Sequence, residues 1–171
     1  LSIVDLTKQG NQPLMRNDKV ISFNGEIYNY GELRTELVGL GYKFFSNTDT
    51  EVILVGYIHW GLDFVKKLNG MFALCIYDKA IKKLILARDK AGEKPLYYYH
   101  NEQTFCFASE IKALIWHSLF DRKISHSNLA EYLTFGYTSK NKTILRSFKK
   151  LIPGTVMTYD LGTHLLKSEV F

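Results

Sequence analysis

Several features that would assign a protein to a class at once are missing from this sequence. Its longest apolar stretches, residues 71–77 and 84–87, fall far short of the roughly 18 to 20 apolar residues that a membrane-spanning helix needs. Its first residues lack the positively charged region and apolar run of a secretory signal. We therefore expect a protein that does not cross a membrane. The sequence also begins without methionine, which is consistent with removal of an upstream segment.

Cysteine is scarce, and spacing typical of metal ligands is absent. The two cysteines, Cys75 and Cys106, lie inside apolar, strand-like runs, where buried free thiols are the usual state. Free thiols suit a reducing compartment, so we expect a cytoplasmic protein. The five histidines show no metal-like spacing, and no metal site is expected.

Basic residues outnumber acidic ones without forming a patch. Lys and Arg total 22 against 17 Asp and Glu, which gives a formal net charge of +5. Such an excess can indicate a polyanionic partner. Here, however, the basic residues occur as pairs among acidic and apolar neighbours, with no run of five or more. Solvated surface is the better interpretation, so nucleic acid is not an expected partner.

What the sequence does contain is the composition and periodicity of a globular domain. Its 171 residues are 46% hydrophobic and 23% charged, which suits one domain better than two. Runs rich in β-branched and aromatic residues predict strands at residues 20–23, 71–77, 84–88, 96–99, 104–108 and 155–159. The polar connections at 78–83 and 100–103 are short enough to join antiparallel neighbours, so a meander is expected rather than parallel βαβ units.

Helical periodicity appears between these strands. Apolar residues at helical spacing predict helices around residues 33–40, 52–59 and 111–115, with a shorter one at 128–135. Loops are expected at residues 136–142 and 149–154. Helices before, within and after antiparallel strands indicate an α+β domain in which helices cover the outer face of each sheet.

The most specific motif is FNGEIYNY at residues 23–30, which closes one predicted strand and opens the first predicted helix. Taken alone, Asn-Gly after a strand is a favoured tight turn, because both residues tolerate positive φ. The whole string, however, resembles the oxyanion-hole segment of class II glutamine amidotransferases. It is most similar to that of glutamine-hydrolysing asparagine synthetases.

The resemblance implies roles for three residues of this string. In the family, an asparagine side-chain amide and a glycine backbone N–H point at the carbonyl oxygen of glutamine's side chain, so Asn24 and Gly25 are the expected oxyanion hole. Attack on an amide carbon pushes negative charge onto that oxygen, and one fixed donor stabilises it by about 3 kcal/mol. Glycine lets the backbone come close, and asparagine supplies an uncharged donor. Glu26 is expected at the amino-acid end of glutamine, where its carboxylate suits a cationic α-ammonium.

A second motif, SNTDTEVIL at residues 46–54, has two interpretations. Thr48 followed by Glu51 three residues later fits a capping box, and Asp49 in the first turn favours the helix dipole. The resemblance adds a further role, because the family places an aspartate of this motif on glutamine's α-amino group. Asp49 is the matching position, and a helix start is a rigid place from which to aim a carboxylate.

Other strings identify the family more than they identify a site. RDKAGEKPLYY at residues 88–98 and FASEIKAL at residues 107–114 resemble stretches of asparagine synthetases, and we interpret them as mainly structural. Gly92 and Pro95 are expected to shape a turn. The family has phenylalanine-glycine where this chain has Ala91-Gly92, a departure that a packing position should tolerate. Together with residues 152–154 and 159–162, the likeness covers nearly the whole chain with its motifs in the family's order.

The beginning of the chain supplies only part of the expected pocket. In the family, the stretch that matches residues 1–6 follows an arginine that binds glutamine's α-carboxylate, and the backbone after it lines the pocket. This assigns substrate contacts to Leu1, Ile3 and Val4. The family's nucleophile is a cysteine at residue one of the mature chain, with its own α-amine as base. We therefore expect residues 1–171 to be a glutamine amidotransferase domain truncated at its N-terminus and inactive by itself.

The resemblance also implies a fold, cofactors and partners. The fold is a four-layer αββα sandwich of two antiparallel sheets, as in N-terminal nucleophile hydrolases. An unpaired sheet edge left by the truncation would allow a homodimer. Glutamine is the expected ligand, and no cofactor is expected in this domain. ATP and Mg are expected in a synthetase domain downstream of Phe171, which would convert aspartate to asparagine.

Two alternatives stay open. The same glutaminase could feed a different acceptor, such as a sugar acid in polysaccharide biosynthesis, because the residues that choose the acceptor are not part of this motif set. From another class, the chain could be a degenerate, non-catalytic interaction domain. The retained set of Asn24, Gly25, Glu26 and Asp49 favours the glutaminase, since an inactive domain has no reason to keep all four.

Overall fold

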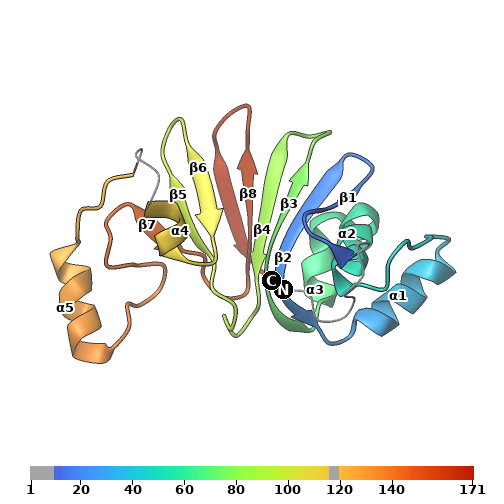
Figure 1. Ribbon diagram of the computed structural model, residues 1–171, viewed down its shortest axis with the longest axis horizontal. Helices are drawn as coiled ribbons and strands as arrows, with labels where there is room; N and C mark the ends of the chain where they lie inside the picture. The colour runs from blue at the N-terminus through green and yellow to red at the C-terminus, as the bar shows by residue number, and fades with distance from the viewer. Residues whose placement is uncertain (1–9, 116–119) are drawn as a thin grey trace. The chain divides into compact units, whose positions relative to one another are not determined.

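The computed structural model describes residues 10–115 and 120–171, which divide into two units. The described residues up to Lys94 form the first unit together with Gly154–Phe171, and Pro95–Pro153 form the second. Each unit has its own antiparallel sheet (Figure 1). Each unit also has its own hydrophobic core.

The first unit is built on a six-stranded sheet. Its strand order is β1-β2-β3-β4-β8-β9, and every neighbouring pair is antiparallel. The pairing of β2 with β3 runs from Lys19 opposite Asp78 to Ile27 opposite Gly70. The strands are β1 (Leu14–Arg16), β2 (Lys19–Ile27), β3 (Gly70–Asp78), β4 (Lys83–Arg88), β8 (Thr155–Asp160) and β9 (Leu166–Val170).

Three helices pack against one face of this sheet. Side chains alternate along a strand, so Ile21 and Phe23 of β2 share a face with their register partners on β3, Ile76 and Leu74. All four belong to one buried core with apolar residues of the helices. The helices are α1 (Tyr30–Gly39), α2 (Asp49–Trp60) and α3 (Phe64–Lys67), with the 3-10 helix η2 (Gly61–Asp63) between the last two.

The second unit contains a three-stranded antiparallel sheet in the order β6-β5-β7. Aromatic rings fill its core: the ring centroids of Tyr99 and Phe120 lie 4.6 Å apart, and those of Phe120 and Phe148 lie 5.6 Å apart. The Ser125 hydroxyl caps the start of α5, which ends at Gly136 in the left-handed region. The elements are β5 (Tyr97–His100), β6 (Phe105–Ala108), β7 (Phe148–Lys150), α4 (Ile111–Ile115) and α5 (His126–Phe135).

Most of the secondary structure expected from the sequence is confirmed. The six predicted strands are present as β2, β3, β4, β5, β6 and β8, and the two short polar connections join antiparallel neighbours. The four predicted helices are present as α1, α2, α4 and α5. The α+β class with two antiparallel sheets is therefore the observed one.

Some local predictions are wrong. Strands β1, β7 and β9 were not expected, and β7 includes Lys149 and Lys150 from a predicted loop. The tight-turn interpretation of Asn24 and Gly25 is also wrong, because pairing with β3 keeps both residues inside β2. Leu40, expected on the buried face of the first helix, follows the end of α1 and is 51% exposed.

Candidate active site

The candidate site lies where β2 ends and α2 begins, within the first unit. Asp49 is the first residue of α2 and is buried. Its Oδ2 accepts a hydrogen bond from the backbone N–H of Ile27 at 3.1 Å, and its Oδ1 accepts one from the backbone N–H of Thr50 at 2.8 Å. The carboxylate is thus fixed between the last residue of β2 and the first turn of its own helix.

Two opposing effects set the charge of this carboxylate. Burial raises the pKa of Asp49, and the nearby negative charge of Glu26 raises it further, while the hydrogen bonds from Ile27 and Thr50 oppose the shift. Within the described residues, neither Glu26 nor Asp49 forms an ion pair with Lys or Arg. A cationic ligand bound beside these two carboxylates would offset the repulsion between their negative charges.

Gly25 is required by the approach of two backbones. Its φ is +154°, and a Cβ built there would lie 2.0 Å from the carbonyl oxygen of Met71 on β3. Gly70 has the matching constraint, since its Cβ would lie 2.2 Å from the carbonyl oxygen of Glu26. Gly70 is not among the residues predicted from the sequence, although its place at the start of an apolar run was a signal. Both glycines bring β2 and β3 together beside Asn24, which is half-buried on the same strand.

The segment after β2 is fastened to the start of β3. The backbone N–H of Tyr28 donates to the carbonyl of Asn69 at 2.8 Å. The side chain of Asn29 donates to the carbonyl of Lys67 at 2.9 Å and accepts from the N–H of Asn69 at 3.0 Å. Asn29 therefore fixes the end of the FNGEIYNY string, a role that was not predicted from the sequence.

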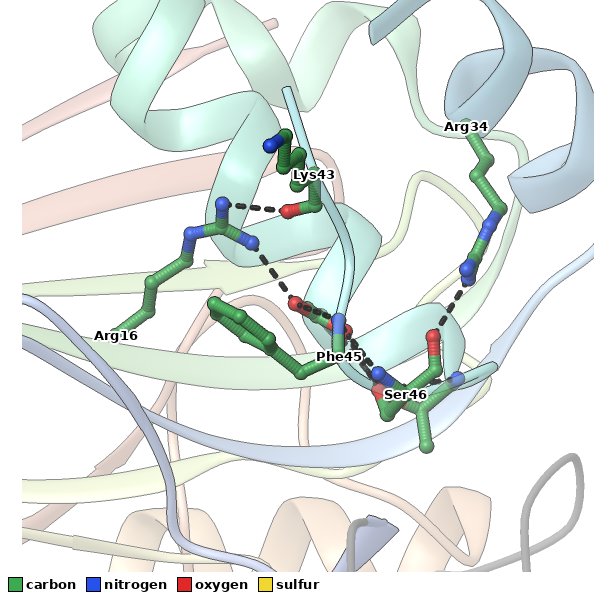
Figure 2. Close-up of polar contacts among 7 residues, drawn as sticks. Arg16, Arg34, Lys43, Phe45 and Ser46 are labelled. Atoms are coloured by element: carbon green, nitrogen blue, oxygen red, sulfur yellow. Dashed lines mark hydrogen bonds and ion pairs between the residues drawn. The ribbon is translucent and has the colours of Figure 1, made fainter. Parts of the chain in front are cut away.

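The expected capping box is half confirmed. The Thr48 hydroxyl accepts from the backbone N–H of Glu51 at 3.1 Å, as a helix cap should. The carboxylate of Glu51, however, accepts from the backbone of Phe45 and Ser46 and from Arg16 (Figure 2). In a complete capping box the Glu51 carboxylate would accept from the backbone N–H of Thr48. Here it accepts instead from residues earlier in the chain.

The Arg88–Lys94 turn has the structural role that the sequence predicted. Gly92 has a φ of +72°, and buried Asp89 organises the turn. Its carboxylate accepts from the backbone N–H of Glu93 at 2.9 Å, of Lys94 at 3.0 Å and of Phe72 at 3.2 Å. Phe72 is the register partner of Gly25, so Asp89 also holds β3 beside the candidate oxyanion strand.

Other expected groups can be placed only in part. Leu1, Ile3 and Val4 lie outside the described residues. Cys75 is buried in β3 and Cys106 is half-buried in β6, and burial raises the pKa of both thiols. In residues 10–115 and 120–171, no group of three or more His, Cys, Asp or Glu side chains could hold a metal ion. No helix in that part of the chain is long and apolar enough to span a bilayer.

Comparison with known sequences gives a consistent result. A family model described as a glutamine amidotransferase domain matches residues 1–168. The glutamine-hydrolysing asparagine synthetase 1 of Bacillus subtilis is 42% identical over 160 residues, which cover 92% of this chain and 25% of that protein. Asparagine synthetase 3 of the same organism is 36% identical over 165 residues, covering 94% and 27%. The chain thus spans about a quarter of the length of these curated relatives.

Comparison with solved structures concerns the fold alone. The glutamine phosphoribosylpyrophosphate amidotransferase of Bacillus subtilis matches with a TM-score of 0.62 at 22% identity. The match covers 93% of this chain and 31% of that one. This likeness supports the fold class expected from the sequence.

Proposed function

The chain belongs to the family of glutamine amidotransferase domains, and from this premise we propose that it is the glutaminase domain of an asparagine synthetase. In this role it releases ammonia from glutamine for the ATP-dependent conversion of aspartate to asparagine. The curated relatives support this role, because they are named glutamine-hydrolysing asparagine synthetases and match 92% and 94% of this chain.

The observation that carries the proposal is the pair of carboxylates at the end of β2. Burial raises the pKa of Asp49, the backbone hydrogen bonds from Ile27 and Thr50 oppose that rise, and the negative charge of Glu26 adds a smaller increase. The α-ammonium of glutamine is a cation that would relieve the repulsion and offset the cost of burying the charge. Asp49 and Glu26 are therefore proposed to bind the amino-acid end of glutamine.

The spacing along β2 suits the rest of the substrate. Residues two apart on a strand project from the same face, so Asn24 and Glu26 lie on one side of β2. Two residues advance the strand by about 7 Å, which is comparable with the length of glutamine's extended side chain. Glutamine held at Glu26 would thus place its side-chain carbonyl beside Asn24. Asn24 and the Gly25 backbone N–H are proposed to stabilise the oxyanion formed there.

The nucleophile is proposed to precede Leu1. Burial raises the pKa of Cys75 and of Cys106 and so disfavours the thiolate of each, and neither therefore suits attack on glutamine. A cysteine with a free α-amine ahead of Leu1 would supply both nucleophile and base. Leu1, Ile3 and Val4 would then line the carboxylate end of glutamine. Glutamine hydrolysis is therefore proposed to require that cysteine.

The remaining chemistry is proposed for a separate synthetase domain of the same protein. Amidation of aspartate needs ATP and Mg, and both are proposed to bind in that domain. The match covers 25% and 27% of the length of the two curated relatives, and the rest of their length is enough for such a domain. A homodimer remains a further proposal, to be checked by light scattering of the full-length protein.

Ammonia release tests the proposal. We expect the longer protein with its leading cysteine to release ammonia from glutamine, whereas a version with that cysteine changed to alanine should not. Equal ammonia release from the two proteins would overturn the glutaminase assignment. Comparing aspartate with a sugar acid as acceptor, under the same conditions, then tests the asparagine synthetase assignment separately.

A further inference from the structure

A buried carboxylate lies two residues after Asp49 in the same helical turn. Glu51 is 1% exposed. Its Oε1 accepts from Arg16 Nη1 at 2.8 Å, and its Oε2 accepts from both the backbone N–H and the hydroxyl of Ser46 at 2.7 Å. The backbone N–H of Phe45 also donates to Oε1, at 3.0 Å. Figure 2 shows how Arg16, Phe45 and Ser46 lie in these contacts. Burying a carboxylate is costly unless it is paired and hydrogen-bonded, so this set of contacts favours one arrangement of the loop before α2.

The contacts close into a ring around the start of α2. The backbone N–H of Glu51 donates to the Thr48 hydroxyl, which lies 2.9 Å from the Ser46 hydroxyl. The Ser46 hydroxyl in turn donates to the Glu51 carboxylate. Asp49 lies between Thr48 and Glu51, inside the segment that this ring fixes. Any shift of Glu51 therefore moves the backbone that carries Asp49.

Two arginines from other elements hold the same loop. Arg16 of β1 also donates to the carbonyl of Lys43 at 2.6 Å, and its guanidinium lies 5.1 Å from the ring centroid of Phe45. Arg34 of α1 donates to the carbonyl of Ser46 at 2.7 Å. Figure 2 shows the two guanidinium groups reaching the loop from different elements. The loop is thereby tied to β1 and α1 as well as to α2.

The two carboxylates of this turn differ in charge compensation. Glu51 is neutralised by Arg16, whose side chain is itself only 13% exposed. Asp49 has no ion-pair partner among the described residues and accepts hydrogen bonds from backbone N–H groups. The uncompensated negative charge at the start of α2 is therefore that of Asp49. A cationic ligand is attracted to Asp49 rather than to Glu51.

We propose that Glu51, held by Arg16, is a positioning residue that fixes the orientation of Asp49 toward the α-ammonium of glutamine. The inference rests on the proposed function, because it assumes that Asp49 binds that group. Binding groups have to be held within about 0.5 Å of their productive position by their neighbours, and Glu51 joins the loop, the cap and the helix that determine where Asp49 lies. Glu51 itself touches no substrate.

Steady-state glutaminase kinetics of the full-length protein test this role. We expect Glu51→Gln to raise KM for glutamine about tenfold with kcat nearly unchanged, because the oxyanion strand is not altered while Asp49 is displaced. Arg16→Lys keeps the charge but loses the fork that reaches both Glu51 and Lys43, so a smaller rise in KM is expected. If Glu51→Gln fails to fold, as judged by circular dichroism, Arg16→Lys decides the question.

A substrate analogue separates positioning from simple stabilisation. 4-Carbamoylbutanoate is glutamine without its α-amino group, so wild-type protein should prefer glutamine strongly and Asp49→Asn should lose that preference. Glu51→Gln should lose part of it, and the double variant should be no worse than Asp49→Asn alone. Additive effects in the double variant, or an unchanged KM in folded Glu51→Gln and Arg16→Lys, would overturn the positioning role.

The second unit offers a matched control. Glu131 of α5 also holds a loop, accepting from the N–H of Ser139 at 2.7 Å and from Lys142 Nζ at 3.0 Å. Glu131→Gln removes a carboxylate that also holds a loop but is more exposed than Glu51, and it should leave KM for glutamine unchanged; a rise equal to that of Glu51→Gln would overturn the inference. If Asp49→Asn itself keeps the preference for glutamine, the proposed function fails instead, so the two failures are distinguishable.

Discussion

The backbone N–H of Ile27 donates a hydrogen bond to the carboxylate of Asp49, with 3.1 Å between the nitrogen and Oδ2. Ile27 ends β2, and Asp49 begins α2. The bond therefore ties the strand that carries Asn24 and Gly25 to the helix that carries the candidate amine-binding group. The two ends of the proposed glutamine site are held together by a contact between residues 22 positions apart.

The first prediction concerns the charge of Asp49. In the full-length protein, Asp49→Asn should weaken glutamine binding by about ten- to a hundredfold, because a hydrogen bond to a charged group contributes roughly 1.5 to 3 kcal/mol. The side-chain oxygen of asparagine can still accept from Ile27, so the fold should persist. Calorimetric titration with glutamine measures the effect. An unchanged dissociation constant would contradict the role of Asp49 and favour a non-catalytic domain.

The second prediction concerns the glycines between β2 and β3. Gly25→Ala should lower the free energy of unfolding by about 1 to 3 kcal/mol or more, since its Cβ would meet a backbone oxygen that cannot move aside. Urea unfolding measures the loss. Gly31→Ala in α1 is the matched control, because nothing lies within 4 Å of the added Cβ and alanine favours a helix. Equal stability of the two variants would contradict the close approach.

Much of the fold could be predicted because strand periodicity is a local property. The runs that became β3, β4 and β8 are apolar and long enough to stand out. β1 and β7 are three residues each, and β9 is mostly exposed and polar, so none has a periodic signal of its own. Their strand conformation depends on neighbours that lie elsewhere in the sequence.

The candidate site shows the same division. The cap from Thr48 to the N–H of Glu51 spans three residues and could be predicted from the motif. The contact between Arg16 and the Glu51 carboxylate spans 35 residues and could not. The string Asn24-Gly25 indicates a turn locally, but pairing with β3 is a long-range interaction that overrides this preference. The motifs predict which residues form the site, while the structure shows which contacts hold those residues in place.

The third prediction concerns Asp89. Asp89→Ala should lower the free energy of unfolding by roughly 2 to 4 kcal/mol, because the backbone N–H groups of Phe72, Glu93 and Lys94 lose their acceptor. Thermal or urea unfolding measures the loss. Asp63→Ala removes an exposed carboxylate paired with Lys66 and should change stability by less than about 0.5 kcal/mol. A similar small effect at Asp89 would show that the turn does not depend on its carboxylate.

The fourth prediction concerns acid stability of the second unit. Hydrogen bonds from Ser139 and then Lys142 lower the pKa of Glu131 from 4.5 to about 2. A carboxylate with a lowered pKa in the folded state contributes stability above its unfolded pKa, and this contribution is lost as pH falls from about 4.5 to about 2. Glu131→Gln should therefore show a weaker loss of stability over that range than the wild type. Urea midpoints of the wild type and of Glu131→Gln, measured at several pH values, check this prediction. If the midpoints of the two proteins fall in parallel as pH is lowered, Glu131 contributes nothing to acid stability.

The last prediction concerns the cysteines and hence the nucleophile. In the full-length protein, Cys75→Ala and Cys106→Ala should each keep glutaminase activity, because burial raises the pKa of both thiols and leaves little thiolate to attack an amide. Folded protein should also react more slowly with a thiol reagent at Cys75 than urea-unfolded protein does. Ammonia release and alkylation rates measure both effects. Loss of activity in folded Cys75→Ala, with binding of glutamine retained, would place the nucleophile in β3 and remove the need for a cysteine ahead of Leu1.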